Sequence, residues 1–577
     1  MNPATLPPPP GSAEPTSASL ALAPIGSVDL PTTPAEPDSP GAVELKASSI
    51  PATPCQHRVH PSTRSPAPVV RPFSVCDNAA SAFLSFSFTK VFPPALPGAQ
   101  DPFNSSLLSA SLAHVLSAYP HFAGKLRLAR ADDVGRPYQK RYGRVWVEYG
   151  AQSDPGVSFT FVQRKDLVKS ILPKEVGERV SDFGALFALP ILPDGGEIVE
   201  LRASPTDRPA LAIRVTRFSD GAAVFGVRIA HALADATTLN RFIADWSDIH
   251  RALLLAGSIS TIPLPSRPFD PEALDAHAAG DLDSPFPDPA VEAQYRLLGR
   301  LEYDLWARPE LHPPGMVQSS APHSSAVAED AARGGERGEP APWSTWDVSA
   351  PVVVRAVQLS AEEVQRIWRR AQALLDASAG TGDSVKITAH DAVVAHLWRL
   401  STRARNLPPA TTLSIIPVIN VRSRVSPPLA LNSSGCPTFF SCAQVDSNDI
   451  LSPAGLSIAA SSLRQAIQTA TPSTISALLR HNAYELDPLR MLDYFGGSTH
   501  LTVSSWLRSG AYSADFGTGT PLCARGMVMP ADGLFLLDDV AAEAWEGQRW
   551  WERGAMMQIW LKEDVMERML ADPELRG

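Results

Sequence analysis

A histidine and an aspartate four positions apart, His231 and Asp235, form the most informative motif of this chain. The histidine follows an apolar, strand-like run, Ala223–Ala230, and the aspartate precedes an amphipathic helical pattern. A side chain at the end of a strand lies near a cleft, and imidazole is the side chain whose unperturbed pKa suits proton transfer near neutral pH. The pattern therefore favours His231 as a general base that activates a hydroxyl or an amine.

The residues after Asp235 predict how this carboxylate is used. Leu239, Phe242, Ile243 and Trp246 recur at the spacing of one helix face. Asp235 then stands at the helix N-cap, where it accepts first-turn N–H groups, so we expect a structural role for it. By itself the H-x-x-x-D pattern is common, and a lone histidine at a strand end is more often a hydrogen-bonded core residue.

Composition excludes several classes of function. A net charge of −10 argues against nucleic-acid binding, which needs a basic surface. The five cysteines show no C-x-x-C spacing, so neither a metal site nor a disulfide framework is expected. No apolar run of membrane-spanning length and no secretory signal are visible, which predicts a cytoplasmic protein without a membrane partner.

The chain alternates helical and strand patterns, which favours an α/β fold. Two buried strands, 211–215 and 223–229, are expected on either side of a turn, and helices are expected over 106–119 and 388–405. A Ser360–Glu363 capping box opens one more helix.

Composition breaks divide the chain. Residues 1–68 are rich in proline and poor in aromatic residues, which predicts a disordered tail. A second polar, Gly- and Pro-rich stretch predicts a linker over 309–345. Two domains of similar size, 69–308 and 346–577, are then expected.

Further segments add to the histidine motif. They are Y-P-H-F-A-G-K-L-R (119–127), I-T-A-H-D-A-V-V-A-H-L-W-R (387–399), I-N-V-R-S-R-V-S-P-P-L (419–429), V-S-S-W-L-R (503–508) and A-D-F-G-T-G-T-P (514–521). Read in this order with R-I-A-H-A-L-A-D-A-T-T-L, they resemble the BAHD family of acyl-CoA-dependent O- and N-acyltransferases. The resemblance runs from about residue 70 to the end of the chain.

The resemblance implies a fold and a reaction. It implies two chloramphenicol-acetyltransferase-like α/β domains, joined by a crossover loop, with the active-site channel between them. Acyl-CoA is then a co-substrate, no cofactor is permanently bound, and a small-molecule alcohol or amine is the acceptor. His231 would be the base for direct attack of the acceptor on the thioester, and the protein is expected to be a monomer.

Other roles are carried over by position. Asp235 would pair with Arg422 of the N-V-R segment. Ser504 and Trp506 would line the reaction centre near the developing oxyanion. The D-F-G-x-G match implies a structural Asp515 that shapes the second domain.

The same D-F-G-x-G match places three residues on the coenzyme side, namely Phe516, Gly517 and Gly519. Three positions depart from the family pattern, because Ala236, Cys436 and Thr518 stand where Gly, Asn and Trp are usual.

Two alternative functions stay open. A peptide-synthetase condensation domain shares the fold and the H-x-x-x-D core, and it takes its acyl group from a carrier protein. A non-catalytic relative that binds CoA or another ligand is the second alternative, and an intact His231 counts against it.

Overall fold

The computed structural model describes residues 55–81, 85–98, 100–172, 180–181, 208–312, 338–380, 382, 384–430, 432–527, 531–541 and 549–577. The described residues all belong to one compact unit. Residues 1–54 of the predicted disordered tail lie outside the described residues. The predicted boundary at residue 68 is wrong, because ordered structure begins earlier in the chain. Strand β1 (Cys55–Val59) already pairs antiparallel with β6 (Val157–Gln163). This short run contains no proline and can therefore join a hydrogen-bonded ladder.

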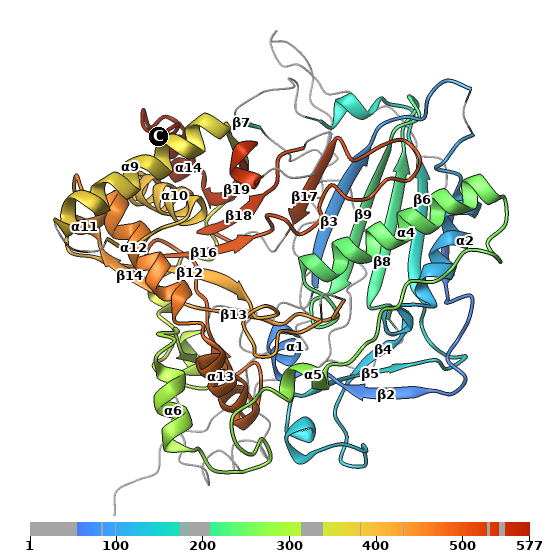
Figure 1. Cartoon of the computed structure of the whole chain (residues 1–577), viewed down its shortest axis with the longest axis horizontal. Helices are drawn as coiled ribbons and strands as arrows, with labels where there is room; N and C mark the ends of the chain where they lie inside the picture. Colours follow the sequence, from blue (N-terminus) through green and yellow to red (C-terminus); the bar gives the residue numbers. More distant parts are fainter. Residues whose placement is uncertain are drawn as a thin grey trace, which may run out of the picture. The chain divides into compact units, whose positions relative to one another are not determined.

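A six-stranded sheet forms the core of the first half of the chain (Figure 1). Its strands in spatial order are β1, β6, β8 (Leu211–Arg217), β9 (Ala223–Ala230), β3 (Ser85–Phe92) and β17 (Cys523–Met527). The expected hairpin is confirmed as the antiparallel β8–β9 pair. Helices α2 (Ser105–Leu116) and α4 (Ala236–Ala256) bury their apolar stripes in the same core as these strands.

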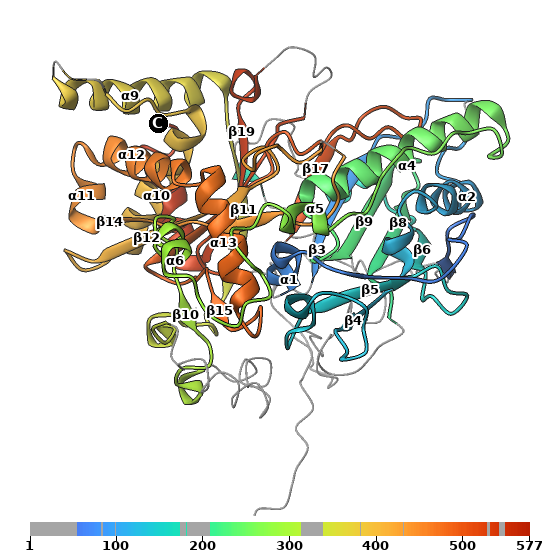
Figure 2. The same ribbon diagram turned by 60° about the horizontal axis from the view of Figure 1, so that its bottom comes forward.

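An eight-stranded sheet forms the core of the second half. Its strands are β13 (Thr438–Phe440), β12 (Thr412–Asn420), β16 (His500–Ser505), β18 (Leu534–Asp538), β19 (Ala555–Lys562), β11 (Val352–Leu359) and β7 (Val180–Ser181), with β14 (Ala443–Asp446) also paired to β12. Figure 2 shows α9 (Ala361–Ala379), α10 (Ala389–Arg405) and α12 (Gly455–Gln468) gathered on one side of it. The Ser360–Glu363 capping box is present at the start of α9.

Each sheet contains one strand from the other half of the chain. β17 follows the D-F-G segment yet pairs with β3 of the first sheet, and β7 precedes residue 309 yet pairs with β11 of the second. An exposed strand edge pairs readily with any extended segment that reaches it. The predicted domains 69–308 and 346–577 are therefore corrected, because neither sheet is built from one continuous stretch.

The predicted crossover at 309–345 is also corrected. Helix α6 (Pro289–Arg296) already packs on α13 (Pro472–Tyr484) of the second half, and β10 (Tyr303–Asp304) pairs with β15 (Met491–Leu492). The N–H of Asp304 donates to the carbonyl of Glu339 at 2.9 Å, so the two ends of this stretch meet. The chain has thus crossed between the halves before α6. Residues 313–337 lie outside the described residues.

Smaller elements complete the described fold. They are the sheet of β2 (Val69–Pro72), β5 (Val145–Tyr149) and β4 (Lys125–Leu128), helices α1 (Val75–Ala80), α5 (Glu272–Asp275), α11 (Ser447–Leu451) and α14 (Glu563–Leu570), and 3-10 turns at Pro120–Ala123, Pro137–Lys140, Val168–Ser170, Pro309–Leu311, Trp343–Thr345 and Trp550–Glu552. Within the described ranges, no helix combines the length and apolar character that crossing a bilayer requires.

Candidate active site

His231 lies in the turn that follows β9, where the first sheet meets residues of the second half. Its imidazole packs on Phe86 of β3, with ring centroids 4.7 Å apart, and the residue is half-buried. The Nδ1 atom lies 3.4 Å from the Sγ atom of Cys436. The β3–β9 ladder fixes this arrangement, since Phe86 and Ile229 are direct cross-strand partners.

The surroundings of His231 favour the neutral ring. Burial lowers its pKa below the usual 6.5, while a hydrogen bond to its own backbone and the charge of Asp235 act in the opposite direction. A backbone carbonyl only accepts, so the ring nitrogen bonded to it must carry a hydrogen. Nδ1 is the ring nitrogen within reach of the residue's own main chain. Nε2 therefore carries the lone pair that proton abstraction requires.

Asp235 is the N-cap residue of α4, with extended backbone angles. Its Oδ1 atom accepts the N–H of Thr238 at 2.9 Å. A carboxylate in this position satisfies an otherwise unpaired first-turn donor and interacts favourably with the helix dipole. The geometry therefore gives Asp235 a structural function at the end of the histidine turn.

Arg422, two residues beyond β12, binds the same carboxylate from the second half. Its Nη1 atom donates to Oδ2 of Asp235, and its Nη2 atom donates to Oδ1 at 3.2 Å. Both residues are buried. Burial alone would raise the pKa of Asp235, but the charge and hydrogen bonds of Arg422, together with the hydrogen bonds from Thr238, leave the pKa below its usual value. The pair thus stays ionised and ties the histidine turn to the second sheet.

The Gly435–Cys436 segment completes this junction. The carbonyl of Gly435 accepts from the backbone N–H of Asp235 at 3.1 Å, from the hydroxyl of Thr238 at 3.0 Å and from Nη2 of Arg422 at 3.1 Å. On the other side, the N–H of Cys436 donates to Oδ1 of Asp77 in α1 at 2.6 Å. The segment beside His231 is therefore fixed by both halves of the chain.

Sequence reasoning did not identify Asp77, Phe86 or the contact of Cys436 with the base. A Ser74–Asp77 capping box opens α1, and this pattern is readable in the sequence. It predicts a helix start but gives no indication that the free carboxylate oxygen reaches a segment 359 residues further along the chain.

Ser504 and Trp506 lie at the end of β16. The indole N–H of Trp506 donates to Oγ of Ser504 at 3.1 Å. The indole stacks on Phe88, with centroids 5.3 Å apart, and meets the edge of Phe86 at 5.7 Å. Phe86 thus contacts both the base and Trp506, which brings the predicted oxyanion residues to the same region as His231.

The D-F-G segment lies away from the base and anchors the second half on the first. Oδ1 of Asp515 accepts the backbone N–H groups of Gly517, Thr518 and Gly519 at 2.7–3.1 Å, and its Oδ2 atom pairs with Arg251 of α4 at 3.3 Å. The segment therefore shapes the contact with the first half as well as the second domain to which it was assigned.

Phe516 is fully buried among aromatic rings of the first core, 4.6 Å from the ring centroid of Phe225 and 4.9 Å from that of Trp246. The prediction that it contacts the coenzyme is corrected, because a side chain enclosed in this way is not accessible to a ligand. Gly517 and Gly519 are exposed and have positive φ angles of 104° and 93°.

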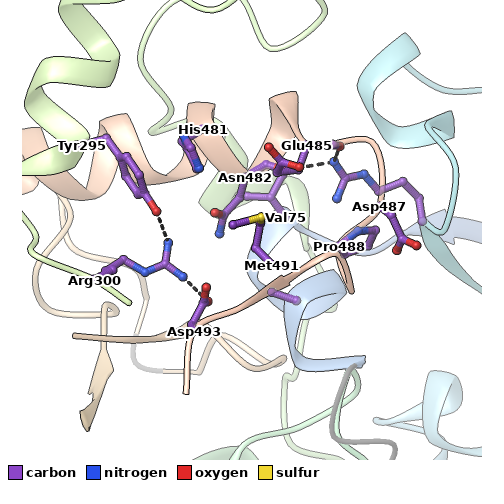
Figure 3. A pocket seen from close by; sticks show the side chains of 12 residues that line it. Val75, Tyr295, Arg300, His481, Asn482, Glu485, Asp487, Pro488, Met491 and Asp493 are labelled. Carbon is purple, nitrogen blue, oxygen red and sulfur yellow. Dashed lines mark hydrogen bonds and ion pairs between the residues drawn. The ribbon is translucent and has the colours of Figure 1, made fainter. Parts of the chain in front are cut away.

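A small cavity is lined by residues of α1 and α13, among them Val75 and His481 (Figure 3). Arg300 bridges Tyr295 and Asp493 on one side of it, and Arg144, Glu485 and other polar groups line the rest. Its free volume of about 30 Å³ accommodates water but no metabolite. Across the described part of the chain, no three His, Cys, Asp or Glu side chains cluster as a metal site requires.

Comparisons with known proteins identify the family of this chain. A family model described as Transferase family matches residues 154–263 and 342–574. The acyltransferase AFT15-1 of Alternaria alternata is 23% identical over 478 residues, covering 81% of this chain and 86% of that protein. The BAHD acyltransferase DCR of Arabidopsis thaliana is 26% identical over 423 residues, covering 72% and 70%.

Among solved structures, TRI101 of F. graminearum in complex with ethyl coenzyme A superposes with a TM-score of 0.59 at 14% identity, covering 88% of this chain and 98% of that one. This likeness confirms the predicted fold class, α/β with two chloramphenicol-acetyltransferase-like domains. The curated relatives are named acyltransferases, and the chain is an acyl-transferring enzyme. It belongs to the Transferase family, the family of the BAHD acyltransferases.

Proposed function

We propose that this enzyme transfers an acyl group from a CoA thioester to the hydroxyl or amine of a small molecule, with His231 as general base. The observation that carries the proposal is the presentation of Nε2 by a ring whose Nδ1 side faces its own backbone and Cys436. The complex of TRI101 with ethyl coenzyme A supports CoA as the carrier of the acyl group.

The reaction needs one base. Nε2 of His231 takes the proton from the acceptor O–H or N–H while the acceptor atom forms a bond to the thioester carbonyl carbon. The tetrahedral intermediate collapses, the carbon–sulfur bond breaks, and the departing thiolate takes the proton back from His231. The products are an ester or amide and free CoA, and His231 regains its starting state.

Ser504 is the better of the two candidate donors to the oxyanion. Its Oγ atom accepts the indole N–H of Trp506, so the Ser504 hydroxyl hydrogen points elsewhere and can be donated. The Trp506 N–H is engaged in that bond and acts through Ser504. A preorganised donor of this kind stabilises charge as it develops in the transition state.

Direct transfer is favoured over an acyl-enzyme. Cys436 is the thiol beside the base, and burial raises its pKa well above the usual value. A protonated, buried thiol is a poor nucleophile. We therefore assign the attack to the acceptor itself.

We expect the monomer to be active, since His231, Asp235 and Arg422 all come from one chain. We also expect the enzyme to act in the cytoplasm, where acyl-CoA is available. Size-exclusion chromatography with parallel activity measurement checks the first expectation, and microscopy of the tagged protein checks the second.

The test is a thiol-release assay with a series of acyl-CoA donors and pooled alcohols and amines. Wild type should release CoA only when an acceptor is present, and His231→Ala should not. Acyl transfer from a carrier protein with none from CoA would support the condensation-domain alternative. CoA that raises the melting temperature of a protein with no turnover on any acceptor would support a binding function.

A further inference from the structure

We propose that Cys436 is the positioning residue of the catalytic base, with its sulfur sharing the Nδ1 hydrogen of His231 with the residue's own carbonyl and holding the ring so that Nε2 faces the substrates. The inference rests on the proposed function of His231. It gives a role to the residue by which this chain departs from the Asn usual in its family.

The hydrogen-bond geometry supports a sulfur acceptor. The Sγ atom of Cys436 lies 3.4 Å from Nδ1 of His231 and 3.3 Å from Oγ1 of Thr438. Nδ1 carries one hydrogen, which also faces the residue's own carbonyl, so the sulfur is the second acceptor of a shared, three-centre hydrogen bond. The thiol hydrogen is then directed at Thr438, and both contacts are satisfied by one arrangement of hydrogens.

The backbone that carries this sulfur is held from three elements. Asp77 of α1 accepts the N–H of Cys436 at 2.6 Å, while Arg422 and Thr238 bind the adjacent carbonyl of Gly435. Cys436 itself is fully buried. A side chain fixed in this way can restrict the rotation of the histidine ring, which a mobile loop residue could not.

Sulfur is a weak acceptor, so its identity should adjust the base as well as orient it. An acceptor on Nδ1 stabilises the protonated ring more than the neutral one and therefore raises the pKa of His231. Asp235 is the charged group that acts on the ring, and it is paired with Arg422. Cys436 contacts the ring, Asp77 binds the N–H of Cys436, and β3 presents the apolar Phe86. Among these, Cys436 can be exchanged while the ion pair is kept.

The test measures the pKa of His231 directly. Diethylpyrocarbonate reacts with neutral imidazole, and mass spectrometry of the tryptic peptide 229–241, which contains a single histidine, follows the reaction from pH 4.5 to 8. Wild type, Cys436→Ala and Cys436→Ser are compared. The apparent pKa should rise in the order Ala, Cys, Ser, with steps of roughly 0.3 to 1 pH unit, since each step changes one hydrogen bond.

A matched control is Cys442→Ser, a half-buried thiol six residues away, which should leave the pKa of His231 unchanged. Thermal melting of every variant separates a folding defect from a change at the ring. The same pKa of His231 in wild type, Cys436→Ala and Cys436→Ser would overturn the proposal. An acetyl adduct on Cys436 after incubation with acetyl-CoA would overturn it as well, because the thiol would then be a nucleophile.

This measurement needs no acceptor, so it separates the two proposals. The expected pKa order in a protein that transfers no acyl group would support the positioning of His231 and reject the proposed function. Acyl transfer with no pKa order would support the proposed function and reject the role of Cys436.

Discussion

Arg422 and Asp235, separated by 187 positions in the sequence, form a buried two-point ion pair that joins the two halves of the chain at the histidine turn. The guanidinium also reaches the hydroxyl of Thr238 and the carbonyl of Gly435. One side chain thus holds the N-cap of α4 and the segment that contacts the base. The catalytic geometry depends on a contact between halves and not on either sheet alone.

Breaking this pair should destabilise the protein more than the loss of a surface ion pair does. Asp235→Asn retains an N-cap side chain but leaves the Arg422 charge buried without its counterion, so the free energy of unfolding should fall by about 3–5 kcal/mol. Arg422→Met should show a similar loss, and the double variant should lose less than the sum. Urea denaturation of the four chains measures this coupling.

The exposed pair Arg568–Asp564 of α14 is the control. Asp564→Asn should change the free energy of unfolding by about 0.5 kcal/mol or less, because water screens both charges. Strictly additive effects of Asp235→Asn and Arg422→Met would show that the pair contributes no coupling.

Removal of the base should reduce catalysis while leaving the fold intact. His231→Ala should lower kcat/KM by about 10²–10⁴-fold, the scale associated with one positioned general base. The comparison variant is His277→Ala, another half-buried histidine placed before α6, which should retain wild-type rates. Near-normal turnover in His231→Ala would remove this residue from the mechanism.

The pH dependence should show the effect of burial on His231. Only the neutral ring accepts a proton, and burial lowers its pKa, so the ring stays neutral at pH values where an exposed histidine is already charged. The midpoint of the acid limb of the kcat/KM profile should therefore lie below pH 6.5. An acid limb well above that value would require another titrating group, and the limb should disappear from the residual activity of His231→Ala.

The parts of the site that were predictable depend on local sequence. The β9 strand, the N-cap at Asp235 and the apolar stripe of α4 follow from short-range periodicity and capping, because each is decided within a few residues. The pairing of Arg422 with Asp235 was predictable only from the family resemblance, because no local pattern links residues 187 positions apart.

The remaining features depend on contacts between distant segments. β17 could not be assigned to the first sheet from its own residues, because edge pairing depends on which strand end is free. The bond between Asp77 and Cys436 likewise exists only once α1 and the second half are packed together. The linker composition at 309–345 indicated a surface loop but not where the chain crosses between the halves.

Gly435 offers a test of how closely the histidine turn is packed against α1. Its φ angle is +91°, and an added Cβ atom would lie 2.7 Å from Oδ1 of Asp77. Gly519 has a φ angle of +93° with nothing within 4 Å of a Cβ atom, so it provides a matched control for backbone strain. Alanine at either position should cost about 1–2 kcal/mol for the left-handed backbone.

Gly435→Ala should lower the free energy of unfolding by about 1–3 kcal/mol more than Gly519→Ala does. The added methyl group displaces Asp77 and so breaks its hydrogen bond with the N–H of Cys436. Chemical denaturation of both variants gives the difference. Shortening the Asp77 side chain should relieve the contact, so the double variant Asp77→Ala/Gly435→Ala should lose less stability than the sum of the two single variants. Equal losses in Gly435→Ala and Gly519→Ala would mean that α1 yields to the added methyl group, and the histidine turn would then not be held against it.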